Sequence, residues 1–172
     1  MVRTRIGLGF DTHPFDSDEG RPLLLGGVRF DGARGLAGHS DGDTVCHAIA
    51  DALLGAVAAG DIGQHFPDAD PSIAGLAGLE LLARTVVIVA GHGALPAACD
   101  VTILAERPAI APRREEMRGA LALTLGVEID AVSVKATRPE GLGLTGDGIG
   151  CLALATVVDA GHDTDHVAGE LR

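Results

Sequence analysis

Apolar and polar positions along the chain change period several times, and each change predicts a new strand or helix. Short apolar or alternating runs typical of strands occupy residues 3–10, 23–30, 98–106, 131–137 and 150–158. Longer helix-type patterns that close with glycine occupy residues 44–60, 76–93 and 112–126. Because strands and helices alternate, we expect an α/β (α+β layered) domain in which helices cover one face of a sheet.

Glycines and polar turns refine this outline. The run LLLGGVRF at 23–30 is predicted to be one strand with a glycine bend. Ser40 or Asp41 is expected to cap the helix at 44–60, because short polar side chains accept hydrogen bonds from the first backbone N–H groups of a helix. Residues 61–71, DIGQHFPDADP, have turn chemistry and are predicted to form a loop.

The sequence shows no internal repeat and no linker between domains. We therefore expect a single domain at residues 1–158, without a fused second enzyme, followed by an acidic and mobile tail at residues 159–172. His162 and His166 lie four residues apart in this tail, and we expect them to be solvated rather than bound to a metal. A single domain of 172 residues is long enough to bury a sizeable core.

Composition favours a cytoplasmic protein without a membrane partner. No apolar run approaches the roughly 20 residues of a membrane helix, and the N-terminus lacks a signal-peptide pattern. Cys46, Cys99 and Cys151 are odd in number and widely spaced, so we expect buried free thiols in a reducing compartment. With no Trp, no Tyr and only four Phe, the core must consist of small aliphatic side chains, and we expect oligomerisation to supplement it.

The net charge is −11, and Lys135 is the only lysine. This composition argues against a nucleic-acid partner, because phosphate neutralisation needs clustered Lys and Arg. The same charge constrains any phosphate chemistry. A polyanionic substrate would have to be neutralised by bound metal ions or by backbone N–H groups.

Two histidines and a carboxylate form the first candidate site. Asp11 and His13 are i and i+2 of an extended segment, so they share one face, although the triplet taken alone favours a turn Asp beside an exposed His. His47 alone also fits a buried neutral histidine. Together the three offer the ligand set of a catalytic zinc site with an open fourth position. We expect Asp51 to orient His47 and His39 to face the same cleft.

The second candidate site is the glycine-bearing loop that follows the strand at 131–137. Backbone N–H groups and the Thr137 hydroxyl suit phosphate oxygens, while the Glu140 carboxylate suits a Mg²⁺ ion that bridges two phosphates. An ordinary run of β-turns fits the same residues.

These segments, in this order, resemble the 2-C-methyl-D-erythritol 2,4-cyclodiphosphate synthase family of the non-mevalonate isoprenoid pathway. The matching stretches run from residue 5 to about 157 and read RIGLGFDTHPF, GHSDGDTVCHAIADALLGAVAAGDIGQHFPDAD, DVTILAERP, and VKAT followed by EGLGLTG. The resemblance implies a phosphorus-oxygen lyase that cyclises 4-diphosphocytidyl-2-C-methyl-D-erythritol 2-phosphate to 2-C-methyl-D-erythritol 2,4-cyclodiphosphate and releases CMP. It also implies a homotrimer with inward-facing sheets and interfacial active sites.

The resemblance assigns roles to individual residues. Asp11, His13 and His47 match ligands of Zn²⁺ or another divalent cation, and they form the catalytic set together with Thr137 and Glu140. Glu140 matches a ligand of a second metal, Mg²⁺ or Mn²⁺, that bridges the substrate diphosphate. Thr137, Glu140 and Arg138 of a neighbouring subunit are expected at the diphosphate. The other expected substrate contacts, to the methylerythritol part and then to the cytidine, are His39, Ser40, Asp61, Gly63, Phe66, Asp68, Ala105, Pro108, Ala109, Ile110 and Ala111.

The sequence departs from the family pattern near the expected ligands. Ala109 stands where a lysine is common, and Arg138 with Pro139 stands where another threonine-type residue is common. We expect Arg138 to restore the missing positive charge. Asp147 and Ile149 replace an arginine and a glutamate of the trimer's central channel, where an isoprenoid diphosphate has been proposed to bind. We expect Asp147 to weaken such binding.

Two other functions stay open on the sequence alone. A zinc phosphohydrolase would use metal-bound hydroxide and release inorganic phosphate or a linear product. A catalytically degenerate trimer would bind ligand without turning it over, and only the changes at Ala109 and Asp147 favour it. The retained Asp11, His13, His47 and Glu140 argue for the enzyme.

Overall fold

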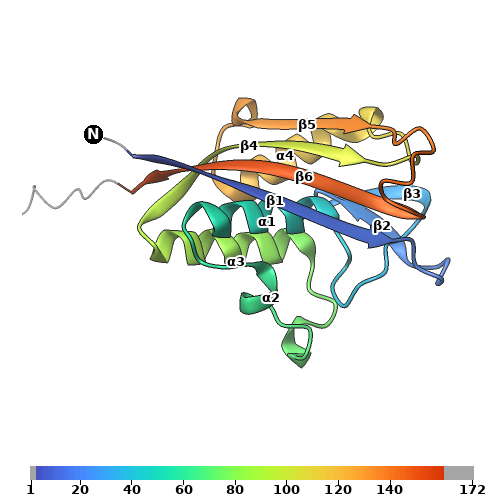
Figure 1. Cartoon of the computed structure of the whole chain (residues 1–172), viewed down its shortest axis with the longest axis horizontal. Helices are drawn as coiled ribbons and strands as arrows, with labels where there is room; N and C mark the ends of the chain where they lie inside the picture. Colours follow the sequence, from blue (N-terminus) through green and yellow to red (C-terminus); the bar gives the residue numbers. More distant parts are fainter. Residues whose placement is uncertain (1–2, 161–172) are drawn as a thin grey trace, which may run out of the picture.

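The computed structural model describes residues 3–160, which form one sheet, one hairpin and a layer of helices (Figure 1). The sheet has the order β1-β6-β4-β5. β1 (Thr4–Pro14), β6 (Gly148–Asp159) and β4 (Ala94–Leu104) pair antiparallel, whereas β4 and β5 (Val132–Thr137) pair parallel. The predicted α/β layered domain is confirmed.

The helices lie on one face of this sheet (Figure 1). α1 (Thr44–Ala56) packs on β1 and β6, α3 (Gly78–Gly91) packs beside α1, and α4 (Arg114–Leu125) packs beside β5. Glycines permit the contact between α1 and β1. A Cβ atom added to Gly7 or Gly9 would lie only 1.8 or 1.9 Å from a backbone oxygen of α1. The two backbones therefore approach more closely than any other residue type allows.

The opposite face of the sheet is not covered by any element within residues 3–160, and its part on β1 and β6 is apolar. Ile6, Leu8 and Phe10 of β1 are 66, 61 and 55% exposed, and Leu152 and Leu154 of β6 are also exposed. They alternate with the buried positions that face α1, as side chains do along a strand. A contiguous apolar patch of this kind marks an interaction surface.

The prediction of one strand at 23–30 is wrong, because the segment folds back on itself. β2 (Pro22–Leu25) and β3 (Val28–Arg34) form an antiparallel hairpin around Gly26 and Gly27. Both glycines have positive φ, +58° and +74°. Two-residue hairpin turns demand this backbone conformation, so a Gly-Gly pair between two apolar runs indicates a hairpin.

The predicted N-cap of α1 is also wrong. Asp43 caps the helix, and its carboxylate accepts hydrogen bonds from the backbone N–H groups of Val45 and Cys46. It is fully buried and also accepts from Gly26 and Gly27 in the hairpin turn. One carboxylate thus joins the start of α1 to the β2–β3 hairpin. The contact with the hairpin is distant in sequence, so local capping preferences do not predict that Asp43 is the cap.

Several boundaries differ from the sequence predictions. α1 ends at Ala56 rather than at Gly60, and the predicted loop at 61–71 contains the short helix α2 (Ile62–His65), capped by Asp61. The short 3₁₀ segments η1 (Pro71–Ile73), η2 (Ala111–Arg113) and η3 (Ile129–Ala131) complete the elements.

At the C-terminal end, β6 includes Asp159, which was assigned to the tail and instead forms an ion pair with Arg5 at 3.1 Å. His162 and His166, with the rest of the predicted mobile tail, lie outside the described residues. The cysteines are free and buried, as predicted. None of the helices within residues 3–160 combines the length and the apolar character that a membrane crossing requires.

Candidate metal centre

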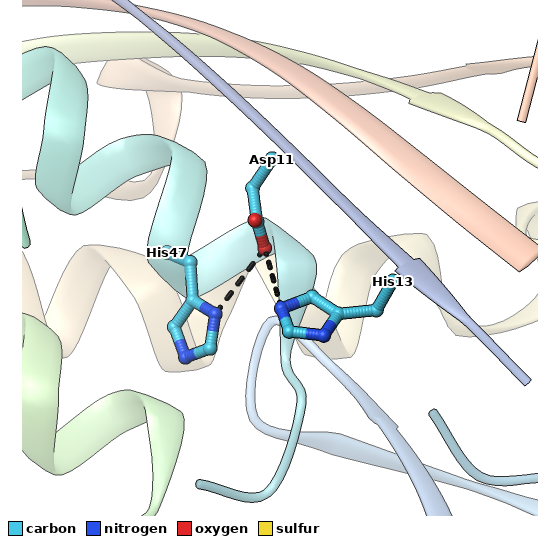
Figure 2. Close-up of side chains that lie close together, drawn as sticks. All are labelled: Asp11, His13 and His47. Atoms are coloured by element: carbon cyan, nitrogen blue, oxygen red, sulfur yellow. Dashed lines mark hydrogen bonds and ion pairs between the residues drawn. The ribbon is translucent and has the colours of Figure 1, made fainter. Parts of the chain in front are cut away.

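Asp11, His13 and His47 converge at one end of the sheet, as their spacing predicts (Figure 2). One Asp11 oxygen, Oδ2, lies 3.2 Å from His13 Nε2 and 3.2 Å from His47 Nδ1. Each residue offers a ligand atom within 4.8 Å of the others, and no other group of this kind occurs within residues 3–160. Spacing along β1 and position on α1 together create the cluster.

The supporting elements explain this convergence. β1 continues past the predicted residue 10 to Pro14, so Asp11 and His13 are both strand residues facing α1. His47 lies near the start of α1, directly across the close contact with β1. The His47 side chain is only 5% exposed, whereas those of Asp11 and His13 are 18% and 21% exposed. The cluster is therefore sheltered on the helix side and accessible from the end of the sheet.

Each imidazole has a hydrogen-bond partner on its outer side, away from Asp11. His13 Nδ1 lies 2.5 Å from the carbonyl oxygen of Ala37, which can only accept, so Nδ1 carries a proton and Nε2 is the nitrogen that can either donate a proton to Asp11 or, once deprotonated, bind a metal ion. His47 Nε2 lies 3.2 Å from Ser40 Oγ, and an Nε2–H donated there leaves Nδ1 bare. Both inward nitrogens then present the lone pair that a metal ion requires.

Electrostatics favour a cation at this point. Burial raises the pKa of the Asp11 carboxyl, but hydrogen bonds and charge from His13 and His47 outweigh it and bring the pKa down to about 2. The hydrogen bond to Asp11 raises the pKa of His13 above 6.5, against the effect of burial. Asp11 is therefore ionised at neutral pH and draws positive charge to the cluster, whether a proton or a metal ion.

The predicted role of Asp51 is wrong. Its carboxylate accepts a hydrogen bond of 2.8 Å from the backbone N–H of Ile62 and so holds the start of α2. The outer partners of the two histidines are instead Ala37 and Ser40. The Ala37 contact uses a backbone carbonyl, which any residue type supplies, so the sequence carries no signal for it.

Within the HSDGD motif at residues 39–43, some side chains contact the metal centre and others stabilise the surrounding fold. Ser40 contacts His47, whereas Asp41 accepts hydrogen bonds from the backbone N–H groups of Gly78 and Asp43, at 2.7 and 3.1 Å. Asp41 thereby fixes the start of α3 against the loop. His39 projects outward and pairs with Asp68 at 3.3 Å, with both side chains well exposed.

The other residues expected at the methylerythritol part follow α1. Asp61 is exposed and accepts a hydrogen bond from the Gln64 N–H at 3.0 Å, and Gly63 lies within α2. Phe66 was expected on a loop that closes over the substrate, yet its side chain belongs to the buried core. In this conformation Phe66 supports the segment from within, while the neighbouring Asp68 stays exposed.

The segments at 105–111 and 137–147 lie at the same end of the sheet, where β4 and β5 end and β6 begins. They are bound to each other. The Ala105 N–H donates to the Thr137 carbonyl at 3.1 Å, and the Gly141 N–H donates to the Glu106 carboxylate at 2.8 Å. Of the expected ligand contacts, Ala109, Ala111, Thr137, Arg138 and Glu140 are exposed, Pro108 is partly buried, and Ala105 and Ile110 are buried.

Distance separates the end of β5 from the metal centre within one chain. β1 and β5 are the two edges of the sheet, so their ends are three strand spacings apart, about 14 Å at roughly 4.8 Å per strand. Thr137, the last residue of β5, therefore cannot share an ion with Asp11 of the same chain. The structure brings together the predicted zinc ligands but not the two halves of the predicted site.

Asp147 is not an isolated negative charge, because two arginines surround its carboxylate. Its carboxylate pairs with Arg107 at 3.4 Å and with Arg34 at 3.6 Å. Both guanidinium groups lie over the Phe15 ring, 5.3 and 5.6 Å from its centre. The local formal charge is therefore positive rather than negative.

Comparisons with known proteins give consistent results. A family model described as the YgbB family matches residues 4–159. The 2-C-methyl-D-erythritol 2,4-cyclodiphosphate synthase of Trichlorobacter lovleyi is 49% identical over 90% of this chain and 97% of its own. The bifunctional IspDF from Campylobacter jejuni superposes with a TM-score of 0.86 at 35% identity, over 92% of this chain and 43% of that one. A 2C-methyl-D-erythritol-2,4-cyclodiphosphate synthase solved in its CDP-bound form gives 0.78 at 34% identity, over 90% and 100%.

Proposed function

The chain belongs to the YgbB family, and from this premise we infer that it is a 2-C-methyl-D-erythritol 2,4-cyclodiphosphate synthase. The 2-phosphate of 4-diphosphocytidyl-2-C-methyl-D-erythritol 2-phosphate attacks the β-phosphorus of the diphosphate. One P–O bond forms, the P–O bond to the cytidylate breaks, and CMP leaves with the electron pair. The observation that carries this conclusion is the Asp11, His13 and His47 cluster in a chain about half identical to such synthases over nearly its whole length.

The residues of the cluster fit a divalent cation. An ionised carboxylate and two imidazoles with engaged outer nitrogens form the donor set of a catalytic zinc site. A Zn²⁺ ion held there would act as a Lewis acid on a phosphate oxygen through its open position. Glu140, an exposed carboxylate, suits Mg²⁺ or Mn²⁺ at the diphosphate.

The protein's own part in the reaction is mainly positioning. A phosphate nucleophile is already anionic at neutral pH, so no strong general base is needed. The gain comes from folding the substrate so that its 2-phosphate lies in line with the breaking bond. His39, Ser40 and Asp61 are proposed to hold the methylerythritol part beside the cluster, and residues 105–111 to form the wall for cytidine. The CDP-bound relative supports a cytidine diphosphate ester as the ligand class.

We propose a homotrimer with the sheets facing inward. Two observations support it: the apolar sheet face around Ile6, Leu8 and Phe10 is exposed in the single chain, and the end of β5 at Thr137 lies three strand spacings, about 14 Å, from the end of β1 in its own chain. A neighbouring chain that covers the apolar face can bring its Thr137 and Glu140 to this metal centre. Sedimentation velocity should give a single trimeric species.

A cytoplasmic location is part of the proposal. Cys46, Cys99 and Cys151 are free and buried, and burial raises the pKa of Cys99 to about 12. Such thiols are inert and suit a reducing compartment.

The test is a ³¹P NMR assay of the purified protein with the cytidine diphosphate ester, Zn²⁺ and Mg²⁺. We expect two coupled phosphorus signals of a cyclic diphosphate and one CMP per turnover. Inorganic phosphate or a linear product would identify a hydrolase instead. Unchanged substrate, with zinc present in the protein, would identify a ligand-binding protein without turnover.

A further inference from the structure

We propose that Arg21 is a positioning residue for the metal centre and acts through the segment at residues 37–40. This inference rests on the metal-binding part of the proposed function, not on the cyclisation. Arg21 precedes β2, is partly buried, and lies outside the residues that form the cluster.

The Arg21 guanidinium holds the backbone of this segment at two points. One nitrogen donates to the Gly38 carbonyl at 3.1 Å, and another donates to the Ser40 carbonyl. The carboxylate of Asp16 accepts from the guanidinium at 3.4 Å and serves as its counter-ion. The backbone of Arg21 is itself fixed, because its carbonyl accepts from the Gly35 N–H at 3.1 Å. The side chain therefore extends from a braced position.

The held segment contains both groups that orient the histidines. The Ala37 carbonyl accepts from His13 Nδ1, and the Ser40 hydroxyl faces His47 Nε2. Residues 37–40 are neither helix nor strand, and two backbone hydrogen bonds, from the Ala37 N–H to the Pro14 carbonyl and from the Gly75 N–H to the His39 carbonyl, hold them besides Arg21. A planar guanidinium with several donors can hold two carbonyls at a set separation, which the single ammonium of a lysine cannot do.

Charge and position predict opposite effects for Arg21, which makes the proposal testable. A positive charge near a cation site weakens cation binding, so removing it should tighten binding if charge dominated. If Arg21 acts by position, removing it should loosen Ala37 and Ser40 and weaken binding. Loss of an outer partner of a metal-binding histidine typically lowers metal affinity by about 10- to 100-fold.

The experiment compares Co²⁺ binding by the full chain and three variants, R21A, R21K and R29A. Co²⁺ affinity is measured by competition with a chromophoric chelator, and its visible absorption reports the coordination geometry. Arg29 is the matched control, because it lies on β3 of the hairpin that follows Arg21, is well exposed and forms an ion pair only with Asp31, at 2.9 Å, within residues 3–160. Circular dichroism and thermal unfolding without metal verify that each variant folds.

We expect R21A to bind Co²⁺ about 10-fold more weakly with an altered visible spectrum, R21K to fall in between, and R29A to match the parent chain. Equal or tighter binding by R21A would overturn the proposal, and if R21A does not fold, unchanged binding by R21K would do so. A parent chain that fails to bind Co²⁺ would overturn it together with the metal centre. A chain that binds Co²⁺ but forms no cyclic product would refute only the reaction.

Discussion

The metal centre and the segments at 105–111 and 137–147 lie at the same end of the sheet but are built in different ways. The metal centre is complete within one chain, because β1 and α1 bring Asp11, His13 and His47 together and residues 37–40 orient them. The other two segments are bound to each other, and their expected diphosphate ligands are exposed.

This difference shows how the fold divides the proposed chemistry. A cation site needs ligand atoms fixed within tenths of an ångström, which a helix packed on a strand provides. A site for a long substrate needs a second wall at a distance, which a neighbouring copy can provide. In the proposed trimer, a neighbouring copy that covers the exposed apolar face of β1 and β6 would bring the two halves together.

The largest expected effect comes from removing one half of the site from each of two chains. H47A and E140A should each lose activity by about 10³-fold, because each loses a group worth several kcal/mol of transition-state charge stabilisation. Coexpression of the two variants should recover about a quarter of the wild-type activity, since random assortment pairs an intact His47 with an intact neighbouring Glu140 in that fraction of interfaces. The measurement is the rate of CMP release from purified mixed trimers.

The control for this experiment is H47A coexpressed with a chain that carries both substitutions, which should recover nothing. Full activity of E140A alone would contradict the role of Glu140. Absence of recovery in correctly mixed trimers would place each site within a single chain and remove the contrast between the two halves.

Asp43 offers the next largest effect, on stability rather than on binding. It is fully buried, unlike Asp11 and His13, and it accepts four hydrogen bonds from backbone N–H groups. D43A would leave those donors unsatisfied and should lower the free energy of unfolding by about 4 kcal/mol. Urea unfolding measures this change. D31A, at an exposed position of the same hairpin, should change it by less than about 0.5 kcal/mol.

The pH dependence of the metal centre should show two opposite trends. The pKa of His13 is raised above 6.5 by Asp11, so the stability that this pair gives the metal-free protein is full below 6.5 and is lost as pH rises through the raised value. Metal binding needs a bare His13 Nε2, so metal affinity should rise over the same range. Melting temperatures without metal and Zn²⁺ affinities, both at pH 6 and pH 8.5, measure the two trends.

The variant H13Q should abolish the stability trend, because glutamine does not titrate. H92A, which removes an exposed histidine after α3, should retain both trends. A metal-free protein that becomes more stable from pH 6 to pH 8.5 would contradict the assignment of the charge pair.

The smallest expected effect concerns the pairing of Asp147. We expect geranyl diphosphate to bind more weakly than micromolar, because the carboxylate of Asp147 occupies the guanidinium groups of Arg107 and Arg34. D147A should free both groups and tighten binding a few-fold, an amount limited by their exposure to solvent. Isothermal titration at low and high salt measures this difference, which should shrink at high salt. Micromolar binding by the wild-type chain would refute the prediction.

The sequence predicts most of the fold and the centre of the site because both depend on local periodicity. Alternation along β1 places Asp11 and His13 on one face, and the helical pattern places His47 on the face toward them. The parts that were mispredicted depend on distant partners. Asp51 bonds Ile62, and Asp43 bonds the glycines of a hairpin, and neither partner is visible in a local pattern.

The hairpin at Gly26 and Gly27 is a different kind of error, since its signal was present. A Gly-Gly pair between apolar runs favours a tight turn over a bend, and the contiguous apolar residues on both sides hid this. Arg21 left no sequence signal, because a single arginine in a polar turn has many ordinary explanations. Its relevance depends on which carbonyls it reaches, and only three-dimensional structure shows that.

The close packing of Gly9 against Ala48 limits which substitutions the metal centre can tolerate. Gly9 is two residues from Asp11, and Ala48 is next to His47. The distance between the backbones of β1 and α1 at this contact therefore sets the distance between Asp11 and His47. A methyl group at position 9 would push α1 away from β1 and spread ligand atoms whose distances to a metal must hold to about 0.2 Å. Alanine at this position should therefore weaken metal binding, which makes an apparently inert glycine as selective as a ligand.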